Sequence, residues 1–522
     1  MRRESQLGEI LEAQQDIFNT IIMDIEELLK TADGKGKSNS EIVETLKKGR
    51  ITPIPNVELA KRVLDVYEHD VYDLSKRKDK WVNADSSDDG DRISTMSGES
   101  KTGKRRQAVN RVGLALQKLI IKRAASFLFG IPVEYTSDSY EKEEMEEIIM
   151  KAFNRIVHDN KLKSLDRRIA RNIFSYQECA EYWYSVNRKH STYGFDSSLR
   201  LKVSLFGPHQ GDKLYPYFDE YNDMVAFSRE FVKDGDGGDV AKTTFFETYT
   251  ATTFRRWSKT GGNSEWELVT KKDGIPLDKI PIVYGYQPYL ETEDVDDLIS
   301  RLETLLSNFA DTNDYHASPK VVVKGKINGW SKKGEAGAVI ELDGEDADVK
   351  YLSWAQAPES VKTEIETLLK MIYTISQTPD ISFDAVKGLG QVSGVALKLL
   401  FMDAHLKVLD KTEIFDEYLT RRANIIKAFI GTIKSELAPA CEEMTIEPTI
   451  TPFMIDDEKA DIEKWLAANG NKPLISHEES VKLANMSQSP ADDYKRIEYE
   501  TSKYWDDIQG EPITGLETEG DF

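Results

Sequence analysis

The residues best placed to do chemistry are glycines and lysines at the spacing of a phosphate-binding loop. Residues 98–104 read Gly-Glu-Ser-Lys-Thr-Gly-Lys, which matches the glycine and lysine positions of such a loop. Arg105, however, stands where the loop needs a Ser or Thr hydroxyl for magnesium, and no apolar strand precedes it. A second near-match at Gly36-Lys37-Ser38 has Thr31 in place of its first glycine. Neither segment predicts a nucleotide site.

Other catalytic and metal-binding patterns also fail on spacing. Gly388 and Gly390 loosely resemble a dinucleotide-binding loop, but no clear strand precedes them. The acid-rich turns at 234–239 and 343–348 lack the glycine and glutamate positions of a helix–loop–helix calcium site. The 7 histidines are scattered, and no two stand four residues apart as in a zinc-binding helix. We therefore predict no enzyme activity, no cofactor and no metal site.

Composition restricts the class of protein further. The chain has 522 residues and a net charge of −22, which argues against a DNA-coating protein because such proteins need clustered Lys and Arg. The same charge is compatible with a surface that DNA passes without binding, and also with an ordinary acidic protein. Cys179 and Cys441 lie far apart and are expected to be small core residues. The most apolar window, 119–132, contains Lys122 and Arg123, so neither a membrane span nor a signal peptide is predicted.

The elements that position these residues change type along the chain. Apolar residues at helical spacing predict amphipathic helices over 5–30 and 56–74, followed by a long mobile loop over 84–107. Residues 108–175 are predicted to be helical apart from an extended piece at 131–136, which Pro132 imposes. From 178 to 285, β-branched and aromatic runs between Gly- and Asp-rich turns predict a mainly antiparallel sheet.

Residues 291–317 are predicted to form a helix with one apolar face and many acids. The residues expected to pack against other helices are Val295, Leu298, Leu302, Leu305 and Phe309. The acids that stand out are Asp294, Asp296, Asp297, Glu303, Asp311 and Asp314. Those near the start of the helix also suit its dipole.

A small β module and two more helices follow. Short strands are predicted at 321–323, 338–342 and 349–352, with turns at Asn328-Gly329 and Asp343-Gly344. Pro358 opens a second helix, which Thr378-Pro379 closes. After a Gly-containing loop at 380–392, Ser393 is a plausible N-cap for a long helix that reaches Lys434.

Two segments carry a family resemblance. Residues 126–135 read Ser-Phe-Leu-Phe-Gly-Ile-Pro-Val-Glu-Tyr, and residues 391–398 read Gln-Val-Ser-Gly-Val-Ala-Leu-Lys. Both, with the order of parts between them, resemble the portal proteins of tailed double-stranded-DNA phages, in the branch with long non-contractile tails. The resemblance spans 56–435. It implies an α+β portal-type fold with an α/β wing, a two-helix stem, a β-containing clip, a tunnel loop with a long helix, and a helical C-terminal crown.

The resemblance also assigns the parts and partners. It implies an N-terminal helical segment (1–55), a wing (56–290), stem helices (291–317 and 358–379), a clip (318–357), a tunnel loop (380–392), a long helix returning to the wing (393–454) and a crown (455–522). Portal subunits form rings, usually of twelve, at one capsid vertex of the virion, after assembly in the host cytoplasm. The implied partners are the terminase large subunit, capsid and scaffold proteins, a head-completion or adaptor protein, and double-stranded DNA in transient contact, with no membrane.

Two residue-level hypotheses follow. Several of the acids on 291–317 are expected to face the channel and repel DNA phosphate, although a merely solvated outer face explains them equally well. Lys387 is the only base between Asp380 and Gln391. With its neighbours Gly388, Gly390 and Gln391, it is the first candidate for phosphate contact in the tunnel loop.

Two other functions of the chain are alternatives to a portal. One is another virion structural protein, such as a capsid or scaffold component, and the other is an enzyme of nucleic-acid metabolism.

Overall fold

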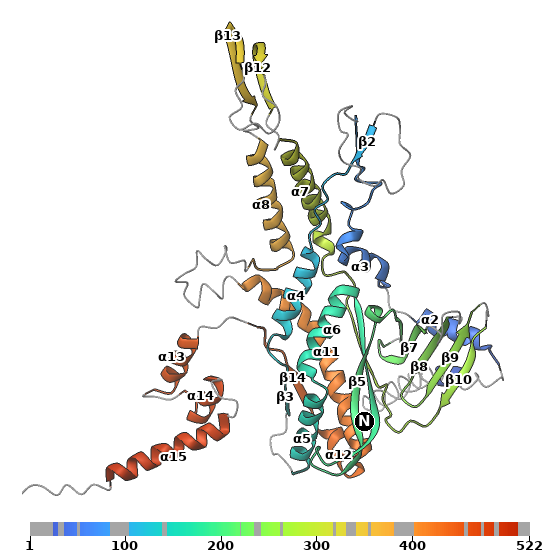
Figure 1. The fold of residues 1–522 in the computed structure, drawn as a ribbon. Coiled ribbons are helices and arrows are strands. Elements are labelled where there is room, and N and C mark those ends of the chain that lie inside the picture. The colour runs from blue at the N-terminus through green and yellow to red at the C-terminus, as the bar shows by residue number, and fades with distance from the viewer. Residues whose placement is uncertain are drawn as a thin grey trace, which may run out of the picture. The chain divides into compact units, whose positions relative to one another are not determined.

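The computed structural model divides the chain into two compact units (Figure 1). Unit 1 comprises Met1–Asp380 and Asp403–Phe453, and unit 2 comprises Ile381–Met402 and Met454–Phe522. The structure describes residues 25–29, 36–49, 53–83, 104–137, 144–219, 221–233, 242–261, 265–316, 320–329, 341–352, 357–380, 401–453, 458–470, 474–484 and 490–509. Both helices and strands are present, so the α+β class predicted from the sequence is confirmed.

Two antiparallel sheets form one part of unit 1. The larger has the order β10-β9-β8-β7-β6 and the smaller has the order β11-β4-β5. Their strands are β4 (Glu178–His190), β5 (Ser197–Phe206), β6 (Lys213–Phe218), β7 (Met224–Lys233), β8 (Thr243–Tyr249), β9 (Phe254–Thr260), β10 (Glu267–Lys272) and β11 (Ile282–Tyr286). Buried side chains from both sheets form one core, which includes Ala180 and Ile282 from the smaller sheet and Phe227 and Tyr249 from the larger. The antiparallel sheet predicted for 178–285 is confirmed.

Helical residues cover the larger sheet. Ile25–Leu29 and α2 (Asn39–Lys48) pack on Phe246 and Trp257. Helix α2 begins with a capping box at Ser38, whose hydroxyl accepts from Glu41 N at 3.3 Å, while the Glu41 carboxylate accepts from Ser38 N at 2.8 Å. Of the helix predicted over 5–30, only the last turn falls within the described residues.

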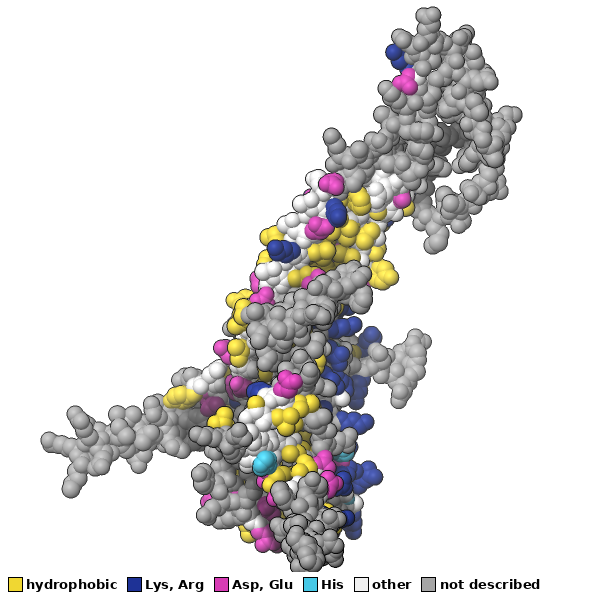
Figure 2. Space-filling view, turned by 90° about the vertical axis from the view of Figure 1, so that its left-hand side faces the viewer, with side chains coloured by type: hydrophobic (Ala, Val, Ile, Leu, Met, Phe, Trp, Pro, Cys, Tyr) yellow, Lys and Arg dark blue, Asp and Glu magenta, His cyan; other side chains and the backbone are white. Residues whose placement is uncertain are grey.

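A layer of helices packs on the smaller sheet. Its members are α3 (Val57–Leu64), α4 (Leu116–Phe129), α5 (Glu144–Asp159), α6 (Leu162–Tyr176), α11 (Met402–Ile433) and α12 (Ala438–Glu443). Phe415 of α11 meets Phe129 and Phe174 edge-on, with ring centroids 5.0 and 6.2 Å apart. Gly285 permits close approach of the sheet, because a Cβ there would lie 2.6 Å from the Ile173 side chain. Figure 2 shows Lys and Arg side chains gathered along one edge of the view.

A buried ion cluster joins this layer to the sheet. Arg422 of α11 is 1% exposed and lies 2.7 Å from Asp166 of α6. It also pairs with Glu181 of β4 and donates to the Tyr135 hydroxyl at 3.1 Å. Each partner removes part of the cost of burying the guanidinium. The long helix predicted to reach Lys434 is described from Met402 to Ile433, and its predicted start at Ser393 lies outside the described residues.

One of the two turns predicted in the β module is wrong. The module contains β12 (Lys320–Gly329) paired with β13 (Glu341–Leu352). Asp343 pairs with Lys326, so the turn predicted at Asp343-Gly344 lies inside β13. Asn328-Gly329 ends β12, next to residues outside the described part of the chain. The register shifts between Lys324 and Lys326 and again between Ile327 and Gly329. Glycines in strands often mark such irregularities, and here they imitated turn signals.

Other predictions are partly corrected. Residues 104–107, assigned to a mobile loop, form β2 (Lys104–Gln107), which pairs with β1 (Lys80–Asn83). The helix predicted for 56–74 ends at Leu64, where Asp65 caps a separate 3-10 turn. The extended piece after Pro132 is confirmed as β3 (Glu134–Ser137), which pairs with β14 (Ile446–Thr449). The described 3-10 turns are Val66–Glu68, Pro208–Gln210, Glu293–Val295 and Ser435–Leu437.

Unit 2 is helical where it is described. Its helices are α13 (Glu458–Ala468), α14 (His477–Ala484) and α15 (Pro490–Gln509), and each contacts the next along the chain. In the described part of the whole chain, no helix is both long enough and apolar enough to cross a membrane.

Candidate functional site on helices α7 and α8

Helices α7 (Asp296–His316) and α8 (Ala357–Ile375) lie side by side, and the β12–β13 hairpin connects them in sequence (Figure 1). The helix predicted for 291–317 begins at Asp296, after a 3-10 turn at Glu293–Val295. Pro358 stands in the first turn of α8, where its missing N–H is tolerated.

A buried apolar cluster holds the pair together. It contains Val295, Ile299, Leu302 and Leu305 next to Leu368 and Ile372 of α8 and Ile120 of α4. Of the residues expected to pack, Leu298 is partly buried against this cluster, and Phe309 is half-buried outside it. Burial of several Leu and Ile side chains at about 1.5 to 3 kcal/mol each makes this contact the main source of stability for the helix pair.

The acids on this helix occupy different environments. Asp294 and Asp297 are exposed, whereas Asp296 is half-buried and Glu303 is 1% exposed. Asp296, Glu303, Asp311 and Asp314 are spaced so that they share one helical face. That face is turned towards other parts of the same chain and not simply towards solvent.

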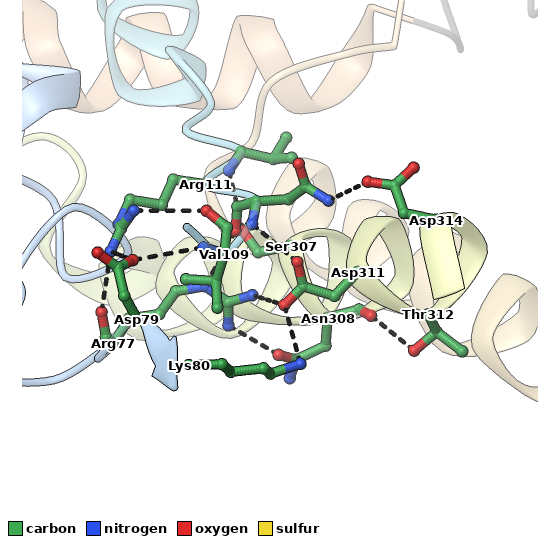
Figure 3. Close-up of polar contacts among 12 residues, drawn as sticks. Arg77, Asp79, Lys80, Val109, Arg111, Ser307, Asn308, Asp311, Thr312 and Asp314 are labelled. Carbon is green, nitrogen blue, oxygen red and sulfur yellow. Dashed lines mark hydrogen bonds and ion pairs between the residues drawn. The ribbon is translucent and has the colours of Figure 1, made fainter. Parts of the chain in front are cut away.

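The C-terminal half of this acidic face binds a segment that we call the strap, the described residues 77–83 and 104–112 (Figure 3). Arg77 donates to Asp311 at 2.8 Å and to Asn308 at 2.7 Å. Asn110 donates from its backbone to Asp311 at 2.7 Å and from its side chain to Asp314 at 2.6 Å. Because each of these bonds has a carboxylate acceptor or the charged Arg77 donor, they are stronger than neutral hydrogen bonds.

A second carboxylate organises the strap itself. Asp79 accepts from Arg111 at 2.7 Å, from Arg106 at 2.7 Å and from Val109 N at 3.3 Å. Burial alone would raise the pKa of Asp79, but these donors outweigh burial and hold it below its usual value. Asp79 therefore stays ionised and ties β1, β2 and residues 109–111 together next to α7.

The N-terminal half of the acidic face surrounds a buried histidine. His69 Nδ1 lies 2.7 Å from a Glu303 carboxylate oxygen, and His69 Nε2 lies 2.9 Å from Val63 O. Burial opposes protonation of His69, but the Glu303 carboxylate and the Val63 carbonyl overcome it and raise the pKa of His69. Burial also raises the pKa of Asp296 to about 6, although Thr292 and Gln117 bond to it. Leu114 N donates to Glu303 at 2.7 Å.

Sequence reasoning missed these roles. The spacing of the four acids was visible, but periodicity cannot tell whether a polar face meets solvent, a channel or another segment of the chain. Arg77, His69 and Asn110 lie about 200 or more residues from their partners in sequence, so no local signal connects them. The tunnel-loop residues Lys387, Gly388, Gly390 and Gln391 lie outside the described residues.

Comparisons with known proteins supply the family. Residues 54–504 match the model of the family described as "Phage portal protein, SPP1 Gp6-like". A chain from the neck of the empty gene transfer agent particle is 10% identical, with a TM-score of 0.40, over 71% of this chain and 89% of that one. A chain from the neck of the native particle is 11% identical, with a TM-score of 0.37, over 71% and 88%.

No curated protein matches the chain. The assignment rests on the family match, which covers far more than half of the sequence and includes both motifs that carried the resemblance. The chain therefore belongs to the SPP1 Gp6-like family of phage portal proteins, which are structural and non-enzymatic components of the virion.

Proposed function

We propose that this chain is the subunit of a ring that encloses a DNA channel at one capsid vertex. The ring admits DNA during packaging, releases it during ejection, and carries the terminase large subunit and later the head-completion or adaptor protein. Membership of the portal family is the observation that carries this proposal. It also makes another virion component or a nucleic-acid enzyme the poorer interpretation.

The parts of the ring follow from the family architecture. In this proposal, residues 56–290 form the wing, α7 and α8 form the stem, and the β12–β13 hairpin lies in the clip. Residues 380–392 form the tunnel loop, 393–454 form the long helix that returns to the wing, and 455–522 form the crown. The apolar cluster shared by α7 and α8 supports a rigid stem.

Channel lining is proposed for the exposed acids of α7 and of the 3-10 turn that precedes it. Asp294 and Asp297 are exposed and fit this role best. Asp296, Glu303 and Asp311 are engaged within the subunit, and Asp314 binds Asn110. Those four are better explained as stabilising the junction between the stem and the wing.

Lys387, between Asp380 and Gln391, remains the candidate for transient phosphate contact in the tunnel loop. Virions with Lys387→Ala are expected to package or eject DNA more slowly. Normal DNA content together with normal ejection would remove this role.

Electron microscopy of the purified protein tests the proposal directly. Rings with an axial hole are expected. The same preparation, added to heads that lack a portal, should restore packaging. A protein that forms no ring under any assembly condition, with scaffold protein present, would contradict it.

A further inference from the structure

Helices α4 and α6 pack against each other and turn bases outwards. The exposed bases are Lys118 and Lys122 on α4 and Lys163, Arg167, Arg168 and Arg171 on α6. We call this surface the basic face. Residues four apart on a helix lie one above the other, so both rows form continuous stripes. The basic face is unusual in a chain with a net charge of −22.

The charge of the basic face is not neutralised within the described part of the subunit. None of its six bases lies within 4.0 Å of a described carboxylate. The sole acid in either helix is Asp166, which is buried and pairs with Arg422. Like charges gathered on one surface repel each other and favour an acidic partner.

A groove runs along this surface beside α3. Its volume is about 570 Å³, and its lining includes four bases (Lys61, Lys118, Lys122 and Arg171), one acid (Asp65) and the apolar side chains of Leu64 and Ile121. The Lys and Arg side chains at the right-hand edge of Figure 2 illustrate how strongly bases gather on one side of this view. A partner that fits this groove must offer both an apolar side chain and carboxylates.

Helix α11 exposes that combination. Leu406 and Leu409 are 49% and 61% exposed, and Asp410, Glu413 and Glu417 are exposed next to them. We call these five residues the acidic face. Their spacing of three or four residues places them on one side of the helix. Exposed leucines in such a row, flanked by acids, are typical of a protein interface.

The acidic face lies on the side of α11 that points away from α6. Helices α6 and α11 meet through Asp166 and Arg422 and through Phe174 and Phe415. At 3.6 residues per turn, Glu413 lies on the side of α11 away from Arg422 and Phe415. The basic face lies beside the α6–α11 contact, since Arg171 is about 60° around α6 from Phe174. Complementary surfaces on different sides of a subunit are what a head-to-tail ring contact needs.

We propose that the basic face of one subunit binds the acidic face of the next subunit in the ring. Leu406 and Leu409 would pack on Leu64 and Ile121, while Asp410 and Glu413 would meet the bases of the groove. This inference rests on the proposed ring. DNA phosphate is the competing ligand for the bases, but it would leave the exposed side chains of Leu406 and Leu409 without an apolar partner.

Charge reversal separates these possibilities. In Lys118→Glu/Lys122→Glu two acids of the groove would meet Asp410 and Glu413, and in Asp410→Lys/Glu413→Lys two lysines would meet the bases of the groove. Like charges across an interface cost several kcal/mol, so each variant alone should assemble at least about tenfold more weakly than wild type. Mixed together, the two variants should alternate and regain rings. Assembly is measured by light scattering after size-exclusion chromatography and by electron microscopy, and circular dichroism checks the fold.

A matched control and a DNA arm complete the design. Lys48→Glu/Lys272→Glu makes the same charge change at exposed lysines outside the basic face and should assemble like wild type. If wild type forms rings and Lys118→Glu/Lys122→Glu does so equally well, this interface is wrong while the proposed function stands. If that variant keeps its rings but loses binding to a short DNA duplex at low salt, DNA is the ligand and the interface is again wrong. A wild-type chain that never forms rings overturns both proposals.

Discussion

The imidazole of His69 and the carboxylate of Glu303 are 2.7 Å apart, and both side chains are almost wholly buried. The pair links the segment after α3 to the middle of α7, across 234 positions of sequence. Val63 O is the hydrogen-bond acceptor for the other ring nitrogen, Nε2. Because both ring nitrogens face an acceptor, the protonated imidazolium, which donates from both, is the form whose hydrogen bonds are all made. Asp296 lies close enough to His69 to favour its charge.

This cluster predicts that stability falls as the pH rises. The folded pKa of Asp296 is about 6, above its usual 3.8, so the folded chain holds more protons than the unfolded chain between these values. The pKa of His69 is also raised in the folded chain. The stability that His69 contributes is therefore fully present below pH 6.5 and is lost as the pH rises through the folded pKa. Asp296→Asn should therefore flatten the decline in melting temperature between about pH 4 and pH 6. Asp294→Asn, which changes an exposed neighbour, should leave the decline unchanged.

The strap gives a prediction about Arg77. Its guanidinium is 14% exposed and binds Asp311, Asn308 and the Asn110 carbonyl. Arg77→Ala should lower the free energy of unfolding by about 1.5 to 3 kcal/mol, since hydrogen bonds to a charged group are lost and Asp311 keeps only the Asn110 N–H and the more distant Lys80. Lys80 approaches the same carboxylate at 3.8 Å but is 63% exposed, so Lys80→Ala should cost less than about 1 kcal/mol. Urea titrations measure the free energy of unfolding of both variants. If Arg77→Ala and Lys80→Ala lower it equally, Arg77 has no specific role.

The buried cluster at Arg422 gives a larger effect. Arg422→Leu would leave Asp166 and Glu181 buried without their cation, and the expected loss is about 3 to 5 kcal/mol. Arg421, the preceding residue, pairs with the exposed Glu417 at 3.6 Å and with no other acid in the described part of the chain, so Arg421→Leu should cost less than about 1 kcal/mol. Adding Asp166→Asn and Glu181→Gln to Arg422→Leu should recover much of the loss. Chemical denaturation of the four proteins checks the order.

The sequence predicted the elements better than their contacts. The strands of 224–272 and the helices around 296–316 and 357–375 follow from apolar periodicity, which local residues determine. The Asp343-Gly344 turn was predicted wrongly because the same residues serve turns and strand irregularities. Strand β2, Lys-Arg-Arg-Gln, has no strand-forming residue, and only its pairing with Trp81 and its neighbours makes it a strand.

The site was less predictable than the fold. Six acids on one helix suggested a single electrostatic role, and the family resemblance directed that role to the channel. The structure shows that these acids differ in burial and partners. Glu303 bonds to His69 and Asp311 bonds to Arg77, and both partners come from segments distant in sequence. Such pairing depends on tertiary contacts, which a single sequence does not encode in any local pattern.

The remaining acids give a prediction about DNA movement. If Asp294 and Asp297 face the channel, each subunit contributes two exposed carboxylates to a ring of negative charge that repels phosphate. Asp294→Asn/Asp297→Asn should then increase attraction between DNA and the wall, slow translocation and reduce the DNA packaged per head, most strongly at low salt, where charges are screened least. Glu144→Gln/Glu147→Gln removes the same charge from exposed positions on α5 and should package normally. Packaging that is unchanged in the first variant, with rings intact, would show that these acids are only a solvated surface.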